Sequence, residues 1–182
     1  MKIIITGTTA GLGLACKEYF SPNHSIIEYN RPQHNLDVTV DTYVTTDFDV
    51  YINNAYSGWG QVDLLYKLYE ANKDRQCMII NIGSVSADGN YDFINPYAVH
   101  KAALDKACMQ MQLLNTECRV IQFKIGRMDT RMVAHRPPPK LSPVWVAQQI
   151  DHVINMPSDV LPKTIVLDNV GGRKNDTIAI VP

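Results

Sequence analysis

Short, almost wholly apolar runs alternate along this chain with longer segments in which apolar residues recur at helical spacing. Runs that are apolar throughout are typical of parallel strands buried on both faces. We therefore predict strands at 2–6, 25–30, 49–55, 77–83, 118–125 and 163–169. The segments between them predict helices at 12–20, 61–74, 97–115 and 143–156. The alternation predicts an α/β fold: a Rossmann-type doubly wound parallel sheet with helices on both faces.

One connection is too short for this pattern. Only about six residues, RPQHNL, separate the second predicted strand from LDVT, whereas the crossover between two parallel strands takes roughly a dozen residues or more. We therefore expect the fold to be abbreviated around the third strand of such a sheet. The polar, β-branched stretch at 38–48 predicts at most a short irregular helix.

Composition limits the classes of protein to consider. The length of 182 residues fits a single domain, 1–182, with a substantial core. The formal net charge of −1 argues against a general polyanion-binding surface, so we expect no nucleic-acid partner. No apolar run approaches the ~20 residues of a membrane span, and the first strand begins at Lys2, so we expect neither a membrane segment nor a leader.

The four cysteines are scattered, without C-x-x-C spacing and without a histidine cluster nearby. This usage predicts reduced thiols in a cytoplasmic protein, and no disulfide framework or metal site.

The turn after the first predicted strand, within ITGTTAGLG at 5–13, holds three of the ten glycines of the chain: Gly7, Gly11 and Gly13. Glycines allow backbone N–H groups and a helix N-terminus to approach an anion closely. In doubly wound sheets ligands bind at the carboxyl ends of the strands, which is where this turn lies. On its own, the turn fits a tight bend as well as it fits a phosphate site.

Four short motifs follow in a fixed order: TGTTAGLG, INNAY, IINIGS and YAVHK. Together they make the chain resemble the short-chain dehydrogenase/reductase family from Met1 to about Asn169. INNAY is similar to the N-N-A-G of that family, with Tyr56 replacing the glycine, and FKIGRMDT is similar to its P-G-x-x-x-T stretch, with Ile125 replacing the proline. The resemblance implies an oxidoreductase that transfers hydride between a nicotinamide dinucleotide and a small carbonyl or alcohol, with the glycine turn facing the pyrophosphate.

The resemblance implies that Ser84, Tyr97 and Lys101 are the catalytic residues, and their chemistry supports this. Tyr97 and Lys101 lie one helical turn apart and project from one face. A neighbouring ammonium favours phenolate, so we expect a lowered Tyr97 pKa and an acid/base role. Ser84 can donate to a carbonyl oxygen that gains negative charge. The resemblance adds that Lys101 holds the nicotinamide ribose. The plainer alternative is a solvated helix pair and a serine that caps a strand.

A second Y-x-x-x-K pair, Tyr69 and Lys73, lies on an earlier helix, with Ser57 twelve residues upstream of the tyrosine. The order of the motifs favours Tyr97, because Ser84 ends the strand that follows N-N-A. We expect the earlier pair to be an exposed helix turn.

Some positions depart from the family. It often has an asparagine upstream of the serine, and that position falls near Ser57, where no asparagine is in reach. His100 occupies a site often held by serine, and we expect it on the helix surface. Asn54 resembles the structural asparagine that ties neighbouring strands together.

Arg31 stands eighteen residues after Gly13, where an NAD-binding protein usually has an acidic residue. A guanidinium cannot accept a hydrogen bond from a ribose 2′-hydroxyl, but it can pair with a 2′-phosphate. We therefore expect NADP in preference to NAD. Glu28, the only acid in the second strand, comes three residues earlier and is expected at an edge or on the surface. The resemblance places the dinucleotide against Gly7, Thr8, Thr9, Gly11, Leu12, Gly13, Asn30, Arg31, Asp37, Val38, Asn53, Asn54, Ala55, Tyr97, Lys101, Gly126 and Thr130.

The segment at about 127–142 predicts a short substrate lid that three prolines stiffen. Arg127, Arg131, His135 and Arg136 could attract an anionic substrate or serve the cofactor phosphates. The helices at 61–74 and 97–115 carry apolar residues beyond one stripe, and the matching helices pair two subunits in the family, so we expect a homodimer.

Two other functions fit parts of the sequence. The abbreviated chain and the missing asparagine suit a non-catalytic dinucleotide-sensing or regulatory protein. The missing crossover helix suits a sugar-nucleotide reductase or epimerase, although the G-x-x-x-G-x-G spacing does not.

Overall fold

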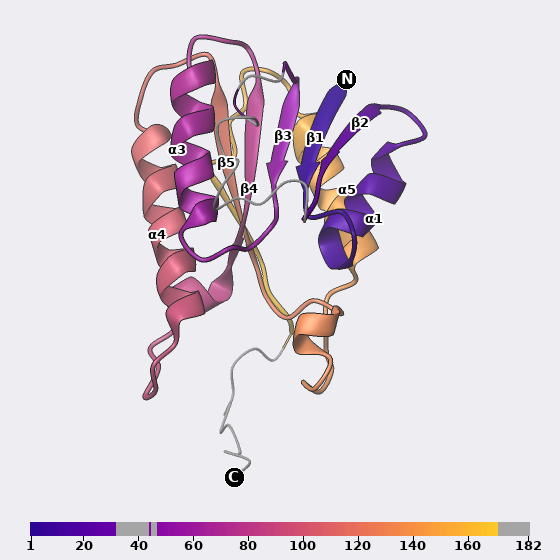
Figure 1. Cartoon of the computed structure of the whole chain (residues 1–182), viewed down its shortest axis with the longest axis vertical. Helices are drawn as coiled ribbons and strands as arrows, with labels where there is room; N and C mark the ends of the chain where they lie inside the picture. Colours follow the sequence, from indigo (N-terminus) through magenta and orange to yellow (C-terminus); the bar gives the residue numbers. More distant parts are fainter. Residues whose placement is uncertain (32–43, 45–46, 171–182) are drawn as a thin grey trace.

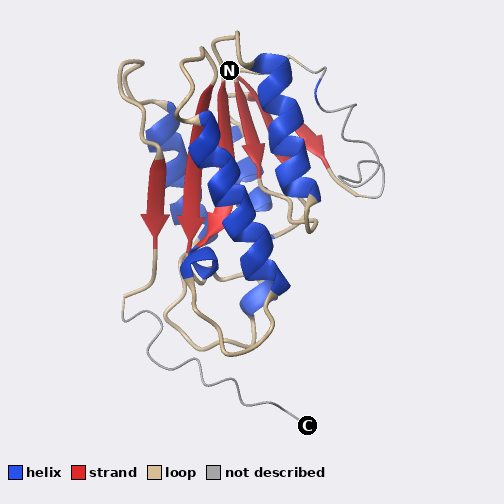
Figure 2. Cartoon of the chain, turned by 90° about the vertical axis from the view of Figure 1, so that its left-hand side faces the viewer, coloured by secondary structure: helices blue, strands red, loops and turns tan. Residues whose placement is uncertain are grey.

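The computed structural model describes residues 1–31, 44 and 47–170. Its strands are β1 (Lys2–Thr6), β2 (Ser25–Tyr29), β3 (Val50–Asn53), β4 (Met78–Ser84), β5 (Arg119–Ile125) and β6 (Thr164–Leu167). They form one sheet in the order β2-β1-β3-β4-β5-β6, and every neighbouring pair is parallel. The arrows in Figure 2 accordingly all point the same way. The predicted doubly wound α/β fold is confirmed.

The described helices are α1 (Gly11–Phe20), α3 (Gly60–Asn72), α4 (Pro96–Met111) and α5 (Pro143–Ile154), with 3₁₀ turns η1 (Val85–Asp88) and η2 (Arg131–Val133). Two of them begin with a capping side chain followed by proline: Asn95 accepts from the Ala98 N–H at 3.2 Å and Ser142 accepts from the Trp145 N–H at 3.4 Å. A side-chain acceptor and a proline that needs no N–H partner suit a helix start. All four predicted helices are confirmed, although α4 ends four residues before its predicted end at 115.

The sheet separates two hydrophobic cores. Ile4 of β1 packs in the core beneath α3 and α4, whereas its neighbours Ile3 and Ile5 pack beneath α1 and α5. This alternation follows from the two-residue period of a strand. Figure 1 shows α3 and α4 on one side of the sheet and α1 and α5 on the other. Both faces are therefore covered, which explains why the strands are apolar throughout.

The predicted abbreviation falls mainly on residues outside the described ranges, which also leave out Asp37 and Val38. Within the described part of the chain, β2 is one edge strand of the sheet and β6 is the other. Phe48, which precedes β3, is buried in the α3/α4 core.

Cys16, Cys77, Cys108 and Cys118 are buried and free, as the scattered spacing predicts. Burial raises the pKa of Cys16 to about 12, so that thiol stays neutral and unreactive. Cys77 and Cys118 stand before the neighbouring strands β4 and β5, and the Cys77 Sγ donates to the Asn72 carbonyl oxygen at 3.9 Å.

Within residues 1–31, 44 and 47–170, no helix has the length and apolar character needed to cross a membrane.

Candidate functional site

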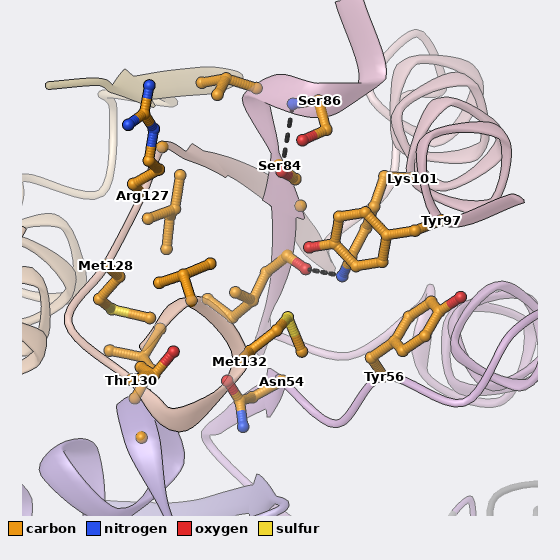
Figure 3. A pocket seen from close by; sticks show the side chains of 18 of the residues that line it. Asn54, Tyr56, Ser84, Ser86, Tyr97, Lys101, Arg127, Met128, Thr130 and Met132 are labelled. Carbon is orange, nitrogen blue, oxygen red and sulfur yellow. Dashed lines mark hydrogen bonds between the residues drawn. The ribbon is translucent and has the colours of Figure 1, made fainter. Parts of the chain in front are cut away.

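A cavity of about 1300 Å³ opens at the carboxyl edge of the sheet. Its walls come from the loops after β1, β3, β4 and β5, including Gly7, Asn54, Ser84 and Gly126. Figure 3 shows Ser84, Tyr97 and Lys101 on one side of it and Met128 and Thr130 on the other. This is the edge at which doubly wound sheets bind their ligands.

The glycine turn shapes one end of the cavity. Gly7 and Gly11 have φ of 73° and 59°, a left-handed conformation that favours glycine. Gly13 is needed for a different reason: a Cβ there would lie 2.0 Å from the Gly7 carbonyl oxygen. Gly11 and Leu12, the first residues of α1, line the cavity. The unpaired N–H groups and positive end of the helix dipole therefore lie at its wall, as a phosphate site requires.

Asn54 ties the turn to the neighbouring strand, as expected. Its Nδ2 donates to the carbonyl oxygens of Thr6 at 2.9 Å and Gly7 at 3.2 Å. The Thr6 hydroxyl oxygen in turn accepts from the backbone N–H groups of Asn54 and Ala55, both at 2.9 Å. These bonds hold the ends of β1 and β3 in a fixed relation across the sheet.

Ser84 and Tyr97 meet at the centre of the cavity. Ser84 ends β4 and accepts from the Ser86 N–H at 3.1 Å, and both Ser84 and Tyr97 line the cavity. Burial raises the Tyr97 pKa above its ordinary value, and the nearby Ser84 hydroxyl opposes this rise only in part. The expected lowering of this pKa by Lys101 is therefore wrong for this structure. The Lys101 Nζ lies 5.6 Å from the centre of the Tyr97 ring and donates its hydrogen bonds elsewhere.

Lys101 is almost wholly buried, with 3% of its surface exposed. Its Nζ donates to the Gln61 Oε1 and to the Ile82 carbonyl oxygen, both at 2.7 Å. Burial lowers the Lys101 pKa to about 7, and the nearby Asp105 carboxylate acts in the opposite direction. The ammonium therefore stands close to the balance between its charged and neutral forms at neutral pH.

Gln61 is a site residue that the sequence analysis missed. It is a buried polar side chain in the first turn of α3, among the apolar Val62, Leu64 and Leu65. The signal available in the sequence was a polar residue, Gln61, among apolar residues at the start of a predicted helix. Its partner Lys101 lies 40 residues away in the sequence, so local spacing could not connect the two.

Tyr56, which replaces the glycine of N-N-A-G, packs against the site. Its ring meets the Tyr97 ring edge-on at 4.9 Å, and its hydroxyl bonds the His100 Nδ1 at 2.9 Å. Figure 3 shows that hydroxyl pointing away from the cavity. His100 is half-buried on α4, also contacts the exposed Trp59 ring and lies outside the cavity lining, which agrees with the expected position on the helix surface.

The second Y-x-x-x-K pair lies outside the cavity lining. Tyr69 is 2% exposed and donates to the Thr116 Oγ1 at 3.2 Å, so it belongs to the core. Lys73 follows the last residue of α3 and pairs with Glu70 at 2.9 Å. The expectation of an exposed turn is wrong for Tyr69, because its helical face packs against the sheet.

Most residues expected to contact a dinucleotide share this cavity. Those in its lining are Gly7, Thr9, Gly11, Leu12, Asn30, Arg31, Asn54, Ala55, Tyr97, Lys101, Gly126 and Thr130. Thr8, Gly13 and Asn53 support the wall from behind. The Thr8 N–H donates to the Asn30 Oδ1 at 2.7 Å, and the Asn30 Nδ2 donates to the Thr8 hydroxyl oxygen at 2.8 Å.

Arg31 and Glu28 face different surroundings. Arg31 is exposed and lines the cavity. Glu28 accepts from the Thr8 hydroxyl and pairs with Lys17 at 2.9 Å, outside the cavity lining. The Thr8 bond and Lys17 hold the Glu28 pKa below its usual range. Glu28 is thus bonded to the glycine turn and to α1, outside the cavity lining. Of these two charged residues, Arg31 is the one that lines the cavity.

The segment 127–142 forms a short loop closed at its base. The Asp129 N–H donates to the Leu141 carbonyl oxygen, and the Leu141 N–H donates to the Arg127 carbonyl oxygen, both at 2.8 Å. Its contribution to the cavity is mixed, with the thioethers of Met128 and Met132 beside cationic side chains: Arg127, Arg131 and Arg136. Within the described ranges, no three His, Cys, Asp or Glu residues gather in a way that could hold a metal ion.

No protein-family model and no curated protein matches the sequence. Solved structures do match the fold. A serine dehydrogenase complexed with NADP⁺ aligns with a TM-score of 0.78 and 19% identity, over 92% of this chain and 94% of that one. A short-chain dehydrogenase from Burkholderia cenocepacia, in complex with NADP, aligns with a TM-score of 0.75 and 17% identity, over 91% and 87%. A 4-hydroxyisoleucine dehydrogenase complexed with NADH and succinate gives 0.75 and 17%, over 93% and 97%. The chain has the short-chain dehydrogenase/reductase fold.

Replacing Gly13 by alanine tests the close contact beneath the turn. Because the new Cβ would meet the Gly7 carbonyl, we expect Gly13→Ala to lower the free energy of unfolding by about 1–3 kcal/mol, as overpacking does. Urea unfolding measures this, with Glu18→Ala, at an exposed position of the same helix, as the control. Equal stability of the two variants would show that α1 does not approach the turn this closely.

Proposed function

We propose that this chain, which has the fold of the short-chain dehydrogenases/reductases, is an NADP(H)-dependent oxidoreductase that interconverts a carbonyl and an alcohol on a small molecule by hydride transfer. The observation that carries the proposal is the convergence of Ser84, Tyr97 and Lys101 on the cavity that the glycine turn shapes. Four motifs far apart in the sequence supply one continuous lining. A structural role for the three polar residues would not require them to share a cavity with a phosphate-type turn.

The residues present fit a dinucleotide. The first turn of α1 and the glycines provide a wall with backbone donors for a pyrophosphate. Asn54 and Ala55 supply the middle of the same wall, and Thr130 faces them from the loop after β5. Lys101 stands at the far end, beside Tyr97, where it would meet the nicotinamide ribose. When bound, the dinucleotide supplies or accepts the hydride.

Tyr97 is proposed as the acid/base. Its raised pKa keeps the phenol protonated at neutral pH, so in the reductive direction it can donate its proton to the substrate oxygen as negative charge develops there. Ser84 accepts from the Ser86 N–H, which orients its hydroxyl group. The Ser84 O–H can then donate to the same substrate oxygen and stabilise the developing charge. A protonated phenol suits carbonyl reduction better than alcohol oxidation.

The preference for NADP over NAD rests on Arg31. Arg31 lines the cavity, whereas Glu28 is bound to Thr8 and Lys17. A 2′-phosphate would therefore meet a cation, and a ribose 2′-hydroxyl would not meet a free carboxylate at this point.

The chain acts as one domain, 1–182, with the loop 127–142 as its substrate lid. Val99 and Met109 of α4 are more than half exposed, as are Leu113 and Leu114 beyond its end, which supports a homodimer through this surface. Four free buried thiols suit a cytoplasmic protein.

A dinucleotide sensor without turnover is the second candidate. The observation that favours it is the engagement of Lys101 with Gln61 and Ile82, together with the bulk of Tyr56 beside Tyr97. Such a protein would bind NADPH and would not need the acidic proton of Tyr97.

Tyr97→Phe tests the assignment of the acid. The variant keeps the ring and loses only the transferable proton, so we expect carbonyl reduction to fall at least ~100-fold, within the usual contribution of general acid catalysis, while NADPH affinity changes little. Nicotinamide absorbance measures turnover on a panel of aldehydes and ketones, and fluorescence titration measures NADPH binding.

Tyr66→Phe is the matched control, because Tyr66 is 43% exposed on α3, outside the cavity lining, and its hydroxyl donates to the Gln110 Oε1 at 2.8 Å. We expect this control to retain full turnover. Loss of activity in Tyr66→Phe with retention in Tyr97→Phe would contradict the proposed acid.

Arg31→Ala tests the cofactor preference. Loss of a charge-assisted pair with the 2′-phosphate should weaken NADPH binding by about 1.5–3 kcal/mol and leave NADH binding almost unchanged. Calorimetric titration of both cofactors gives the two affinities. Arg119→Ala, at the amino end of β5 and hence at the opposite edge of the sheet, is the control. Equal losses for NADPH and NADH, or tighter binding of NADH by the unsubstituted protein, would exclude a 2′-phosphate contact.

A further inference from the structure

We infer that Gln61 is a positioning residue for Lys101 and holds its ammonium group beside Tyr97. Gln61 lies four residues after Ser57, near the position where the family that the sequence resembles often has an asparagine. The inference rests on the proposed function for its consequence in catalysis. The contact itself is a property of this chain and can be measured without turnover.

The first support is the depth and geometry of the contact. Gln61 is 2% exposed and Lys101 is 3% exposed, so water does not compete for their bond. The Lys101 Nζ donates to the Gln61 Oε1 at 2.7 Å and to the Ile82 carbonyl oxygen at 2.7 Å. Two acceptors at this distance use two of the three N–H donors of the ammonium. One donor is left for the cavity that Lys101 lines.

The second support is that the Gln61 amide can face only one way. Its Nε2 donates to the Asn53 carbonyl oxygen at 2.8 Å and to the Ile82 carbonyl oxygen at 3.2 Å. Turning the amide would place its NH₂ group against the Lys101 ammonium, which has no acceptor, and its oxygen against two carbonyl oxygens. The surroundings therefore present the Oε1 to Lys101.

The third support is that the helix carrying Gln61 is anchored at the same point. The Asn53 Nδ2 donates to the Gln61 carbonyl oxygen at 3.0 Å and to the Asn81 Oδ1 at 2.9 Å. The backbone and side chain of Gln61 are thus both bonded to the end of β3. Asn53 lies in N-N-A, so the motif fixes the start of α3 and, through Gln61, the position of Lys101.

The electrostatic consequence follows from the other groups around Lys101. Tyr97 and Asp105 share its helix, the Tyr56 ring lies 5.6 Å from its Nζ, and Lys124 of β5 pairs with Asp105 at 2.8 Å. Asp105 is thus shared with a second cation. Desolvation disfavours the charged form of Lys101, and the Gln61 oxygen opposes it together with the Ile82 carbonyl oxygen, because both accept from the Nζ at 2.7 Å. Removing that oxygen should lower the Lys101 pKa, and placing a carboxylate there should raise it.

Gln61 positions the ammonium but does not carry protons. Its Oε1 accepts from Lys101, and both donors of its Nε2 end on backbone carbonyl oxygens. An amide oxygen is too weak a base to take the proton onward. A proton that leaves Tyr97 therefore leaves by the cavity and not through α3.

Two isosteric variants test the inference. Gln61→Met keeps the length of the side chain without its polar atoms, and Gln61→Glu keeps an acceptor and adds charge. The Lys101 pKa is measured by NMR titration of protein with isotope-labelled lysine. The Lys101 signal is identified as the one that is missing from the spectrum of Lys101→Met. Relative to the unsubstituted chain, we expect the pKa to fall by about one unit or more in Gln61→Met, and to rise by ~1–3 units in Gln61→Glu.

Gln110→Glu is the control, because it places the same new charge at an exposed position of the helix that carries Lys101. We expect the Lys101 pKa to be unchanged in that variant. Where Gln61→Met fails to fold, Gln61→Glu still decides the question, since it retains an acceptor opposite Lys101. A Lys101 pKa that is the same in Gln61→Glu, in Gln110→Glu and in the unsubstituted chain would overturn the inference.

The pH dependence of NADPH binding separates this inference from the proposed function. If the ammonium holds the nicotinamide ribose, NADPH affinity falls as pH rises through the Lys101 pKa, because the charged donor is lost. The midpoint of that fall should move down in Gln61→Met and up in Gln61→Glu. Shifted Lys101 pKa values with no NADPH binding in any variant would support the role of Gln61 and contradict the proposed function.

Discussion

The burial of one ammonium group is the constraint on which the candidate site depends. A lone cation cannot be taken out of water at small cost, so its surroundings must supply acceptors. In this chain those acceptors are the Gln61 side chain and the Ile82 carbonyl at the end of β4. Lys101 therefore joins three elements, α4, α3 and β4, at the point where Ser84 and Tyr97 meet. The orientation of Tyr97 in the cavity follows from this arrangement, since it stands one turn before Lys101 on the same helix.

The opposite wall of the cavity is set by backbone contacts instead of charge. Gly13 brings α1 so close to Gly7 that no side chain fits between them, and Asn54, which follows β3, donates to the carbonyl oxygens of Thr6 and Gly7. The result is a helix N-terminus with open donors facing a buried cation across one cavity. The N-terminus of α1 suits the pyrophosphate of a dinucleotide, and Lys101 suits its nicotinamide ribose. A single extended ligand would therefore contact both walls of the cavity.

The sequence could predict features that depend on local period and order. Six strands and four helices follow from apolar runs and helical spacing, and the order of four motifs brings Ser84, Tyr97 and Lys101 together. It could not show Gln61, because its bond to Lys101 spans 40 residues and depends on how α3 packs on the sheet. The burial of Tyr69 and the contact of Tyr56 with His100 are likewise products of packing. The raised Tyr97 pKa was missed for the same reason, since the desolvation that raises it depends on the folded surroundings.

Binding of a dinucleotide and hydride transfer from it are separate events, and one measurement tests both. The chain is incubated with NADPH deuterated at the transferable position of the nicotinamide and with a panel of aldehydes and ketones, and the products are examined by mass spectrometry. Transfer by Tyr97, Ser84 and Lys101 predicts an alcohol with one deuterium on the former carbonyl carbon, at a rate that Tyr97→Phe abolishes. Saturation of the protein by NADPH with no deuterium in any product would contradict the account and establish a dinucleotide-binding protein without turnover.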